Sequence, residues 1–287
     1  MPQGIPTEYV RSRTLGDATL TMISDGSGWS TIINSLVDVP QEVWRREVDA
    51  NENAEVMVGY NVAHLRLGNA SILIDLGFDD PGPESQWMPP QHQRSPGVEA
   101  GLVTIGVKPA DVTHVLITHA HGDHVAGGTI VRDGRRVARY PNARHFLGRT
   151  DWEEYASRTQ SNSYPAVNLG TLLTLGQLEL VDGDREIVPG VTLIHAPGES
   201  PGHSLVRVQS RGEVFYFLGD LFHHPAEVAH VDWVSRGRDA TRMRASRERL
   251  IEAALRENAL LATAHMPFPG LGRLERTAEG IRWRVVD

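Results

Sequence analysis

The chain has 287 residues, of which 40% are hydrophobic and 22% are charged, as in an ordinary globular protein. Its net charge of -8 argues against a broad nucleic-acid-binding surface, which needs a basic face to neutralise phosphates. It has no cysteine, which excludes disulfide bonds and thiolate metal ligands and leaves His, Asp and Glu to hold any metal. The sequence has no apolar run of roughly 18 residues, the length of a membrane span, and no apolar centre of a signal peptide near its start. We therefore expect a cytoplasmic protein that is not associated with membranes.

The first third of the chain predicts a helix, two strands and a long loop. Residues 40–49 begin with a proline and continue with good helix formers. Residues 56–67 and 71–76 predict two strands joined by Gly68-Asn69, a typical hairpin turn. Residues 78–96 are rich in Pro, Gly and Gln and predict a long surface loop.

Strands and helices alternate in the rest of the chain. A short helix is expected near Val103, and residues 112–117 form a β-branched run that ends at Thr118-His119. Further strands are predicted at 144–147, 178–181, 191–195, 205–208 and 214–218, and helices at 150–158 and 239–257, before two short closing strands. The longest helix has its apolar residues on one face and Asn258 as its C-terminal stop. This order favours a layered α/β fold over a regular βαβ winding.

The most informative segment is 118–124, which reads Thr-His-Ala-His-Gly-Asp-His. In an extended stretch His119 and His121 project to the same side, and Gly122 permits a tight turn that brings Asp123 and His124 back toward them. Such a cluster can serve two metal ions less than about 4 Å apart. The alternative is a solvated loop that is rich in histidine by chance, but with 13 histidines in the chain this spacing favours a metal site.

Two metal ions need more ligands than one cluster provides, and three candidates follow later strands. His203 lies in a Pro- and Gly-rich loop, Asp220 follows an apolar run, and His265 follows residues 260–264. Each alone is weak, since a single loop histidine is more often a surface or hydrogen-bonded residue. Together with the cluster they give five His and two Asp, enough for two metals with one bridging carboxylate and open positions for water.

The chain resembles the metallo-β-lactamase superfamily in five motifs that occur in the family's order. They are Leu-Ile-Asp-Leu-Gly at 73–77, the His-x-His-x-Asp-His run at 119–124, Pro-Gly-His at 201–203, Gly-Asp at 219–220, and His265. The C-terminal half is most similar to the branch that contains methyl parathion hydrolase and the quorum-quenching lactonases. The resemblance implies a four-layered αββα sandwich. We expect one such domain over residues 1–287, with 1–18 as an N-terminal extension.

The resemblance also implies roles for individual residues. His119, His121 and His203 would hold the first metal, Asp123, His124 and His265 the second, and Asp220 would bridge both. Asp75 would accept a hydrogen bond from a ligand imidazole and fix its orientation. The implied ions are two divalent cations, with zinc first and Mn²⁺, Co²⁺ or Fe²⁺ as alternatives, and the family likeness suggests a homodimer.

Two residues are predicted to act in catalysis on a small-molecule substrate. Asp123 would orient or carry the proton of a metal-bridging hydroxide. His223 stands where lactonases of this fold often have a tyrosine, and its imidazole could donate a hydrogen bond to the substrate or protonate a departing alkoxide. Trp87, Met88, Trp233 and Phe268 are candidates for an apolar pocket around the metals.

The expected reaction is therefore hydrolysis of an ester-like bond in a lactone, a carboxylic ester or an organophosphate triester. An iron-dependent redox enzyme and a hydrolytic dehalogenase are alternatives on the same ligand set. A non-catalytic metal-binding module is a further alternative, although structural sites are normally closed and need no bridging pair.

Overall fold

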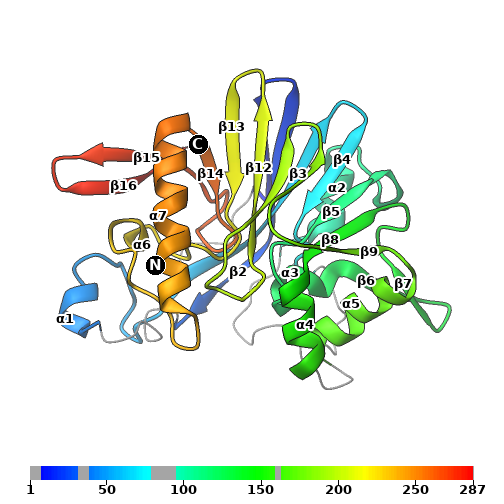
Figure 1. Cartoon of the computed structure of the whole chain (residues 1–287), viewed down its shortest axis with the longest axis horizontal. Coiled ribbons are helices and arrows are strands. Elements are labelled where there is room, and N and C mark those ends of the chain that lie inside the picture. The colour runs from blue at the N-terminus through cyan, green and yellow to red at the C-terminus, as the bar shows by residue number, and fades with distance from the viewer. Residues whose placement is uncertain (1–7, 32–38, 79–94, 159–162, 287) are drawn as a thin grey trace.

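Two seven-stranded sheets form the centre of the molecule (Figure 1). The computed structural model describes residues 8–31, 39–78, 95–158 and 163–286. The strands of the first sheet are, in order across it, β1 (Val10–Leu15), β2 (Ala18–Ser30), β3 (Val56–Leu67), β4 (Ala70–Ile74), β5 (His114–Leu116), β8 (Arg144–Gly148) and β9 (Leu178–Val181). Those of the second are β10 (Arg185–Val188), β11 (Val191–His195), β12 (Ser204–Ser210), β13 (Glu213–Phe217), β14 (Leu260–Ala262), β15 (Leu271–Thr277) and β16 (Gly280–Val285).

Helices cover the outer faces of both sheets. They are α1 (Gln41–Trp44), α2 (Val98–Thr104), α3 (Gly122–Val125), α4 (Arg149–Arg158), α5 (Tyr164–Thr174), α6 (Ala226–Ala229) and α7 (Ala240–Glu257). A separate hairpin is formed by β6 (Thr129–Arg132) and β7 (Arg135–Ala138). Figure 1 shows α7 on the side of the second sheet and α3 to α5 on the opposite side of the molecule. The expected four-layered αββα sandwich is confirmed.

Alternation along the strands explains how each sheet packs on two sides. In β4, Ile74 joins the apolar cluster between the two sheets, whereas Leu73 joins the cluster under α2 and α5. In β12, Val206 faces the other sheet and Leu205 packs with residues of α7. Because successive side chains point to opposite faces, a strand with both faces covered has a continuous apolar sequence.

The hairpin predicted at Gly68-Asn69 is present, with Leu67 opposite Ala70. The helix predicted at 239–257 is α7, which begins after Asp239, whose side chain accepts a hydrogen bond from the Arg242 N–H (3.0 Å), and ends at Asn258 in the left-handed conformation (φ 47°). Both ends follow the capping preferences of helices.

Residues 10–15, within the expected N-terminal extension, form β1 and pair with β2 at the edge of the first sheet. Two helices differ from the sequence predictions. The helix expected at 40–49 is limited to α1. Residues 164–174, for which the sequence predicts no element, form α5; Pro165 lies in its first turn, where a missing N–H costs nothing. Most of the predicted loop at 78–96 lies outside the described residues.

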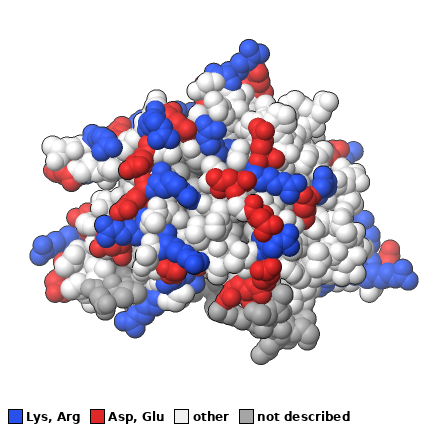
Figure 2. Space-filling view, in the orientation of Figure 1, with Lys and Arg blue, Asp and Glu red and all other residues white. Residues whose placement is uncertain are grey.

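Charged side chains of both signs cover one face of the molecule (Figure 2). On the face in Figure 2, the basic and acidic side chains of the described residues are interspersed, including those over α7, and form no continuous basic patch there. None of the helices in the described part of the chain combines the length and apolar character that crossing a bilayer requires.

Candidate metal centre

The segment 118–124 runs from the end of β5 into α3, which begins at Gly122, and Asp75 fixes the start of this segment. One carboxylate oxygen of Asp75 accepts a hydrogen bond from the Thr118 N–H (2.8 Å), and the other accepts one from the Thr118 hydroxyl (2.9 Å). Asp75 itself has a positive φ of 63°, which turns the chain sharply at the end of β4. The end of one strand thereby holds the loop that follows its neighbour.

Asp75 also orients one histidine of this loop. Its Oδ2 lies 2.8 Å from His124 Nδ1, so the Nδ1–H of the ring is directed at the carboxylate and Nε2 faces the opposite way. This is the geometry that the family resemblance implies for Asp75, and it directs Nε2 toward the place of a cation.

Backbone carbonyls orient two later histidines in the same manner. His203 donates from Nδ1 to the Ala196 carbonyl, and His265 donates from Nδ1 to the Gly59 carbonyl, each over 3.0 Å. Since a carbonyl can only accept, the proton of each neutral ring is on Nδ1, and Nε2 carries the lone pair. His203 and His265 are both buried.

Asp220 lies at the centre of the arrangement. Its Oδ1 is 3.1 Å from both His124 Nε2 and His265 Nε2, and its Oδ2 is 3.5 Å from His119 Nε2. The preceding Gly219 has φ 50°, and a Cβ there would lie 2.8 Å from His203 Nε2, so only glycine lets the chain pass this closely. The carboxylate thus faces ring nitrogens from both sheets.

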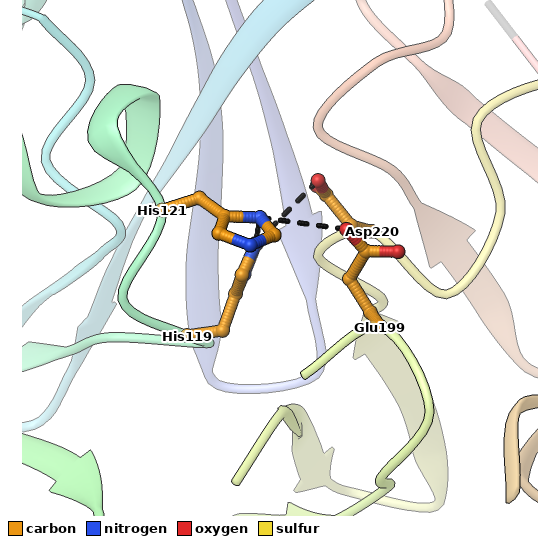
Figure 3. Close-up of side chains that lie close together, drawn as sticks. All are labelled: His119, His121, Glu199 and Asp220. Carbon is orange, nitrogen blue, oxygen red and sulfur yellow. Dashed lines mark hydrogen bonds and ion pairs between the residues drawn. The ribbon is translucent and has the colours of Figure 1, made fainter. Parts of the chain in front are cut away.

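The potential ligand atoms of the centre form two ligand groups and a third group that shares one member with each of them. In the first, drawn in Figure 3, one atom from each of His119, His121, Glu199 and Asp220 lies within 4.8 Å of the others. In the second, the same holds for Asp123, His124 and His265, and Asp220 also forms a third group with His223 and His265.

Six of the seven predicted ligands fall in these groups. The seventh, His203, lies beside them: its Nε2 accepts a hydrogen bond from the Asp220 N–H (3.2 Å), and its ring centre is 5.2 Å from that of His119. Glu199 was not predicted, because a single glutamate in a Pro- and Gly-rich loop has no spacing pattern that marks it.

Two buried polar atoms of the centre lack hydrogen bonds with the described residues and are placed where they could bind a cation. His124 Nε2 and Asp220 Oδ1 are buried, yet neither makes a hydrogen bond with any described residue although they lie 3.1 Å apart. Buried polar atoms without hydrogen bonds are rare and call for an explanation such as an ion. Imidazole nitrogens and carboxylate oxygens that converge in this way fit a divalent metal ion.

The histidines of the centre differ in the direction in which their pKa values are shifted. Burial lowers the pKa of His119 well below its ordinary value, that of His121 to about 4 and that of His203 to about 3, so these rings are neutral at pH 7. Burial also lowers the pKa of His124 and His265, but nearby carboxylates, Asp220 above all, outweigh it and raise both well above the ordinary value. A divalent cation in the second group would therefore take the place of protons on these two rings.

His223 lies at the edge of the centre and is held by a buried carboxylate. Its Nε2 is 3.4 Å from Asp220 Oδ2, and its ring stacks on His265 with centroids 5.3 Å apart. The Glu227 carboxylate accepts hydrogen bonds from the backbone N–H groups of His223 (2.5 Å) and His224 (3.1 Å). The His223 imidazole therefore lies between the Asp220 carboxylate and the His265 ring on one side and the Glu227 carboxylate on the other.

Cavities open on two sides of the centre. One of about 460 Å³ is lined by residues that include His121, Glu199 and Arg238. The other, of about 560 Å³, is lined by His223 and by Met57, Met266 and Phe268. Phe268 thus lines a cavity as predicted, Trp233 is instead buried in a cluster around α1 and β3, and Trp87 and Met88 lie outside the described residues.

Comparison with known proteins agrees with this geometry. Residues 58–265 match the family model of the metallo-beta-lactamase superfamily. An N-acyl homoserine lactonase of Bacillus sp is 25% identical over 250 residues, which are 85% of this chain and 88% of the lactonase.

Solved structures give the same fold. The dizinc quorum-quenching lactonase AidC, in complex with a product, has a TM-score of 0.79 and 21% identity, with 97% of each chain covered. The hydrolase AbOPH of the beta lactamase superfamily has a TM-score of 0.77 and 22% identity, with 98% of each chain covered. The family match extends over most of the chain and contains every predicted ligand from His119 to His265, and the chain belongs to the metallo-beta-lactamase superfamily.

Proposed function

We propose that this protein is a two-metal hydrolase that opens lactones and cleaves related ester-like bonds. The observation that carries the proposal is the position of the Asp220 carboxylate, whose two oxygens face ring nitrogens of the two ligand groups. A single metal would use only one of these groups, whereas a bridging carboxylate is typical of paired metals. The similarity to N-acyl homoserine lactonases supports a lactone as the substrate.

Seven residues would hold the ions, with zinc as the first choice: His119, His121, Asp123, His124, His203, Asp220 and His265. When bound, two divalent cations would lower the pKa of a shared water and polarise the oxygen of the bond to be cleaved. Asp123 supports proton transfer there, since its Oδ2 lies 3.3 Å from His265 Nε2 and 3.5 Å from His124 Nε2. A carboxylate in this place can accept the proton of an attacking water.

His223 supplies the second proton-handling group. Burial lowers its pKa, but the hydrogen bond and charge of Asp220 outweigh burial and raise it. A protonated imidazole that faces the apolar cavity can donate its Nε2 proton to the departing alkoxide of a ring-opened lactone. The apolar lining by Met57, Met266 and Phe268 suits the hydrocarbon part of such a substrate.

The test is metal removal and reconstitution. Dialysis against a chelator should abolish hydrolysis, and addition of Zn²⁺, Mn²⁺ or Co²⁺ should restore it with two equivalents of bound metal. Initial rates on acyl homoserine lactones, aryl esters and phosphotriesters then rank the substrates. Hydrolysis that persists after exhaustive chelation would refute the proposal, and oxygen uptake by an iron-loaded sample would favour the redox alternative.

A further inference from the structure

Glu199 is a buried carboxylate that neither the sequence motifs nor the family resemblance assigns to the site. Its side chain is 0% exposed, and its Oε1 lies 3.4 Å from His121 Nδ1. Figure 3 shows it beside Asp220 and opposite His119 and His121. Its ligand atom falls within the same 4.8 Å group as theirs.

The loop that carries Glu199 is fixed on both sides. Gly198 packs against α7 so closely that a Cβ would lie 2.3 Å from Met243 Cα, and its carbonyl accepts a hydrogen bond from the Asp239 N–H (3.0 Å). On the other side, the Gly202 N–H donates to the buried Asp151 carboxylate (2.6 Å). The backbone on each side of Glu199 is therefore held in place, as the support of a metal ligand requires.

The described residues leave this carboxylate incompletely compensated. Neither of its oxygens makes a hydrogen bond of acceptable geometry, and within the described part of the chain its ion-pair contacts are with Arg238, whose Nη2 is 2.6 Å from Oε1, and with the His121 ring. Arg238 is itself partly exposed, at 30% of its side chain, and lines the adjacent cavity. A buried carboxylate is costly unless it is paired and hydrogen-bonded, or coordinates a metal.

We propose that Glu199 is an additional ligand of the cation held by His119 and His121, and that Arg238 competes with this cation for the carboxylate. The inference rests on the proposed two-metal function and adds a third acidic ligand to Asp123 and Asp220. A further oxygen ligand raises the coordination number and favours harder cations such as Mn²⁺ and Co²⁺ over four-coordinate Zn²⁺.

Two substitutions separate this role from that of a structural ion pair. Glu199→Gln keeps the size of the side chain but removes the charge and weakens the ligand, so it should weaken binding of one metal by about 10-fold or more, the scale of losses around metal sites. Arg238→Gln removes the competing cation, so it should strengthen binding of that metal. If the Glu199–Arg238 ion pair served only to hold the loop, both variants would weaken metal binding.

The experiment uses the metal-free full chain titrated with Co²⁺. Affinity is measured by competition with a chromophoric chelator, and coordination by the visible absorption of bound Co²⁺, which intensifies when a five-coordinate site becomes four-coordinate. Glu154→Gln is the matched control, because it removes one negative charge from the same cavity without a place in either ligand group. Its affinity and spectrum should equal those of the unmodified protein.

The outcomes are distinct. Two bound Co²⁺ with an unchanged spectrum and affinity in Glu199→Gln would overturn the inference while the two-metal site stands. Failure of the unmodified protein to bind two Co²⁺ would overturn the proposed function as well. If Glu199→Gln does not fold by circular dichroism, Arg238→Gln decides alone: tighter binding supports the inference, and equal or weaker binding overturns it.

Discussion

Replacement of Arg247 by methionine should destabilise the protein severely although the residue lies on α7 and outside both ligand groups. Arg247 is 0% exposed. Its Nε donates to the Leu221 carbonyl (2.8 Å), Nη1 donates to the carbonyls of Trp233 (2.6 Å) and Val231 (3.2 Å), and Nη2 lies 3.1 Å from Glu227 Oε1. One guanidinium thus connects α7 to the segment that follows Asp220.

Methionine keeps the packing of the aliphatic stem and removes every polar contact. The Glu227 carboxylate, which is 3% exposed, would then keep its hydrogen bonds from the N–H groups of His223 and His224 and the longer contact with His223 Nδ1 (3.9 Å) but, among the described residues, no arginine. Removal of one partner of a buried pair costs about 3–5 kcal/mol because the other charge stays uncompensated. We therefore expect Arg247→Met to lower the free energy of unfolding by about 4 kcal/mol at pH 7.

The assay is urea unfolding of the metal-free protein, followed by circular dichroism so that metal binding does not contribute. A double-mutant cycle with Glu227→Gln provides the control, because neutralisation of the carboxylate that has lost its partner should recover about 1 kcal/mol or more of stability.

A lower pH should also recover part of the stability that Arg247→Met loses. Burial raises the pKa of Glu227, but other groups, Arg247 first among them, outweigh burial and hold this pKa below the ordinary value. In Arg247→Met the pKa of Glu227 rises, so the loss of stability shrinks as the pH falls and the carboxylate takes up a proton. A loss under about 1 kcal/mol, or exact additivity of the two substitutions, would refute this reasoning.

Three further predictions concern the site and the core. His223→Phe should lower kcat by roughly 100-fold with little change in KM or metal content, because it removes the proton donor and keeps the ring; an unchanged kcat in steady-state assays would exclude the proposed role. In Gly148→Ala the new Cβ would lie 2.3 Å from the Gly202 carbonyl oxygen, so stability should fall by about 1–3 kcal/mol, and chelator competition should report weaker metal binding through the neighbouring His203. Burial lowers the pKa of His145 to about 4, and neither ring nitrogen has a hydrogen-bond partner among the described residues. The unfolded state therefore binds the proton first, and stability is lost as the pH falls from about 6.5 to 4. His145→Leu should remove up to roughly 3 kcal/mol of that loss, whereas an identical pH dependence of urea unfolding in both proteins would contradict it.

The sequence predicts the site well where local pattern and strand ends coincide. His119, His121, Asp123 and His124 are found by their spacing, and Asp220 and His265 by their place directly after apolar runs that form β13 and β14. Such residues are brought to one edge of the sheets by the strands themselves. Their positions can therefore be predicted without knowledge of contacts between distant parts of the chain.

Other features depend on contacts that no local pattern reports. Glu199 reaches the site because Gly198 packs against Met243 of α7, 45 positions later in the chain. The helix α5 contains Pro165 and Gly170, both typical of loops, and is stabilised through Leu169 and Leu172 in the cluster under the first sheet. In both cases the burial of a distant apolar surface overrides the local preference.

The metal centre lies where the two sheets meet, and this location links metal binding to the stability of the whole molecule. Asp123 and His124 extend from the first sheet, whereas Asp220 and His265 follow strands of the second, so a cation that binds all four acts as a cross-link between distant parts of the chain. Binding at about 1,000 times Kd would add roughly 4 kcal/mol of resistance to unfolding. Conversely, a remote substitution that shifts one sheet relative to the other would weaken the affinity for the metal. A measurement of bound metal would therefore report whether the two sheets keep their relative position.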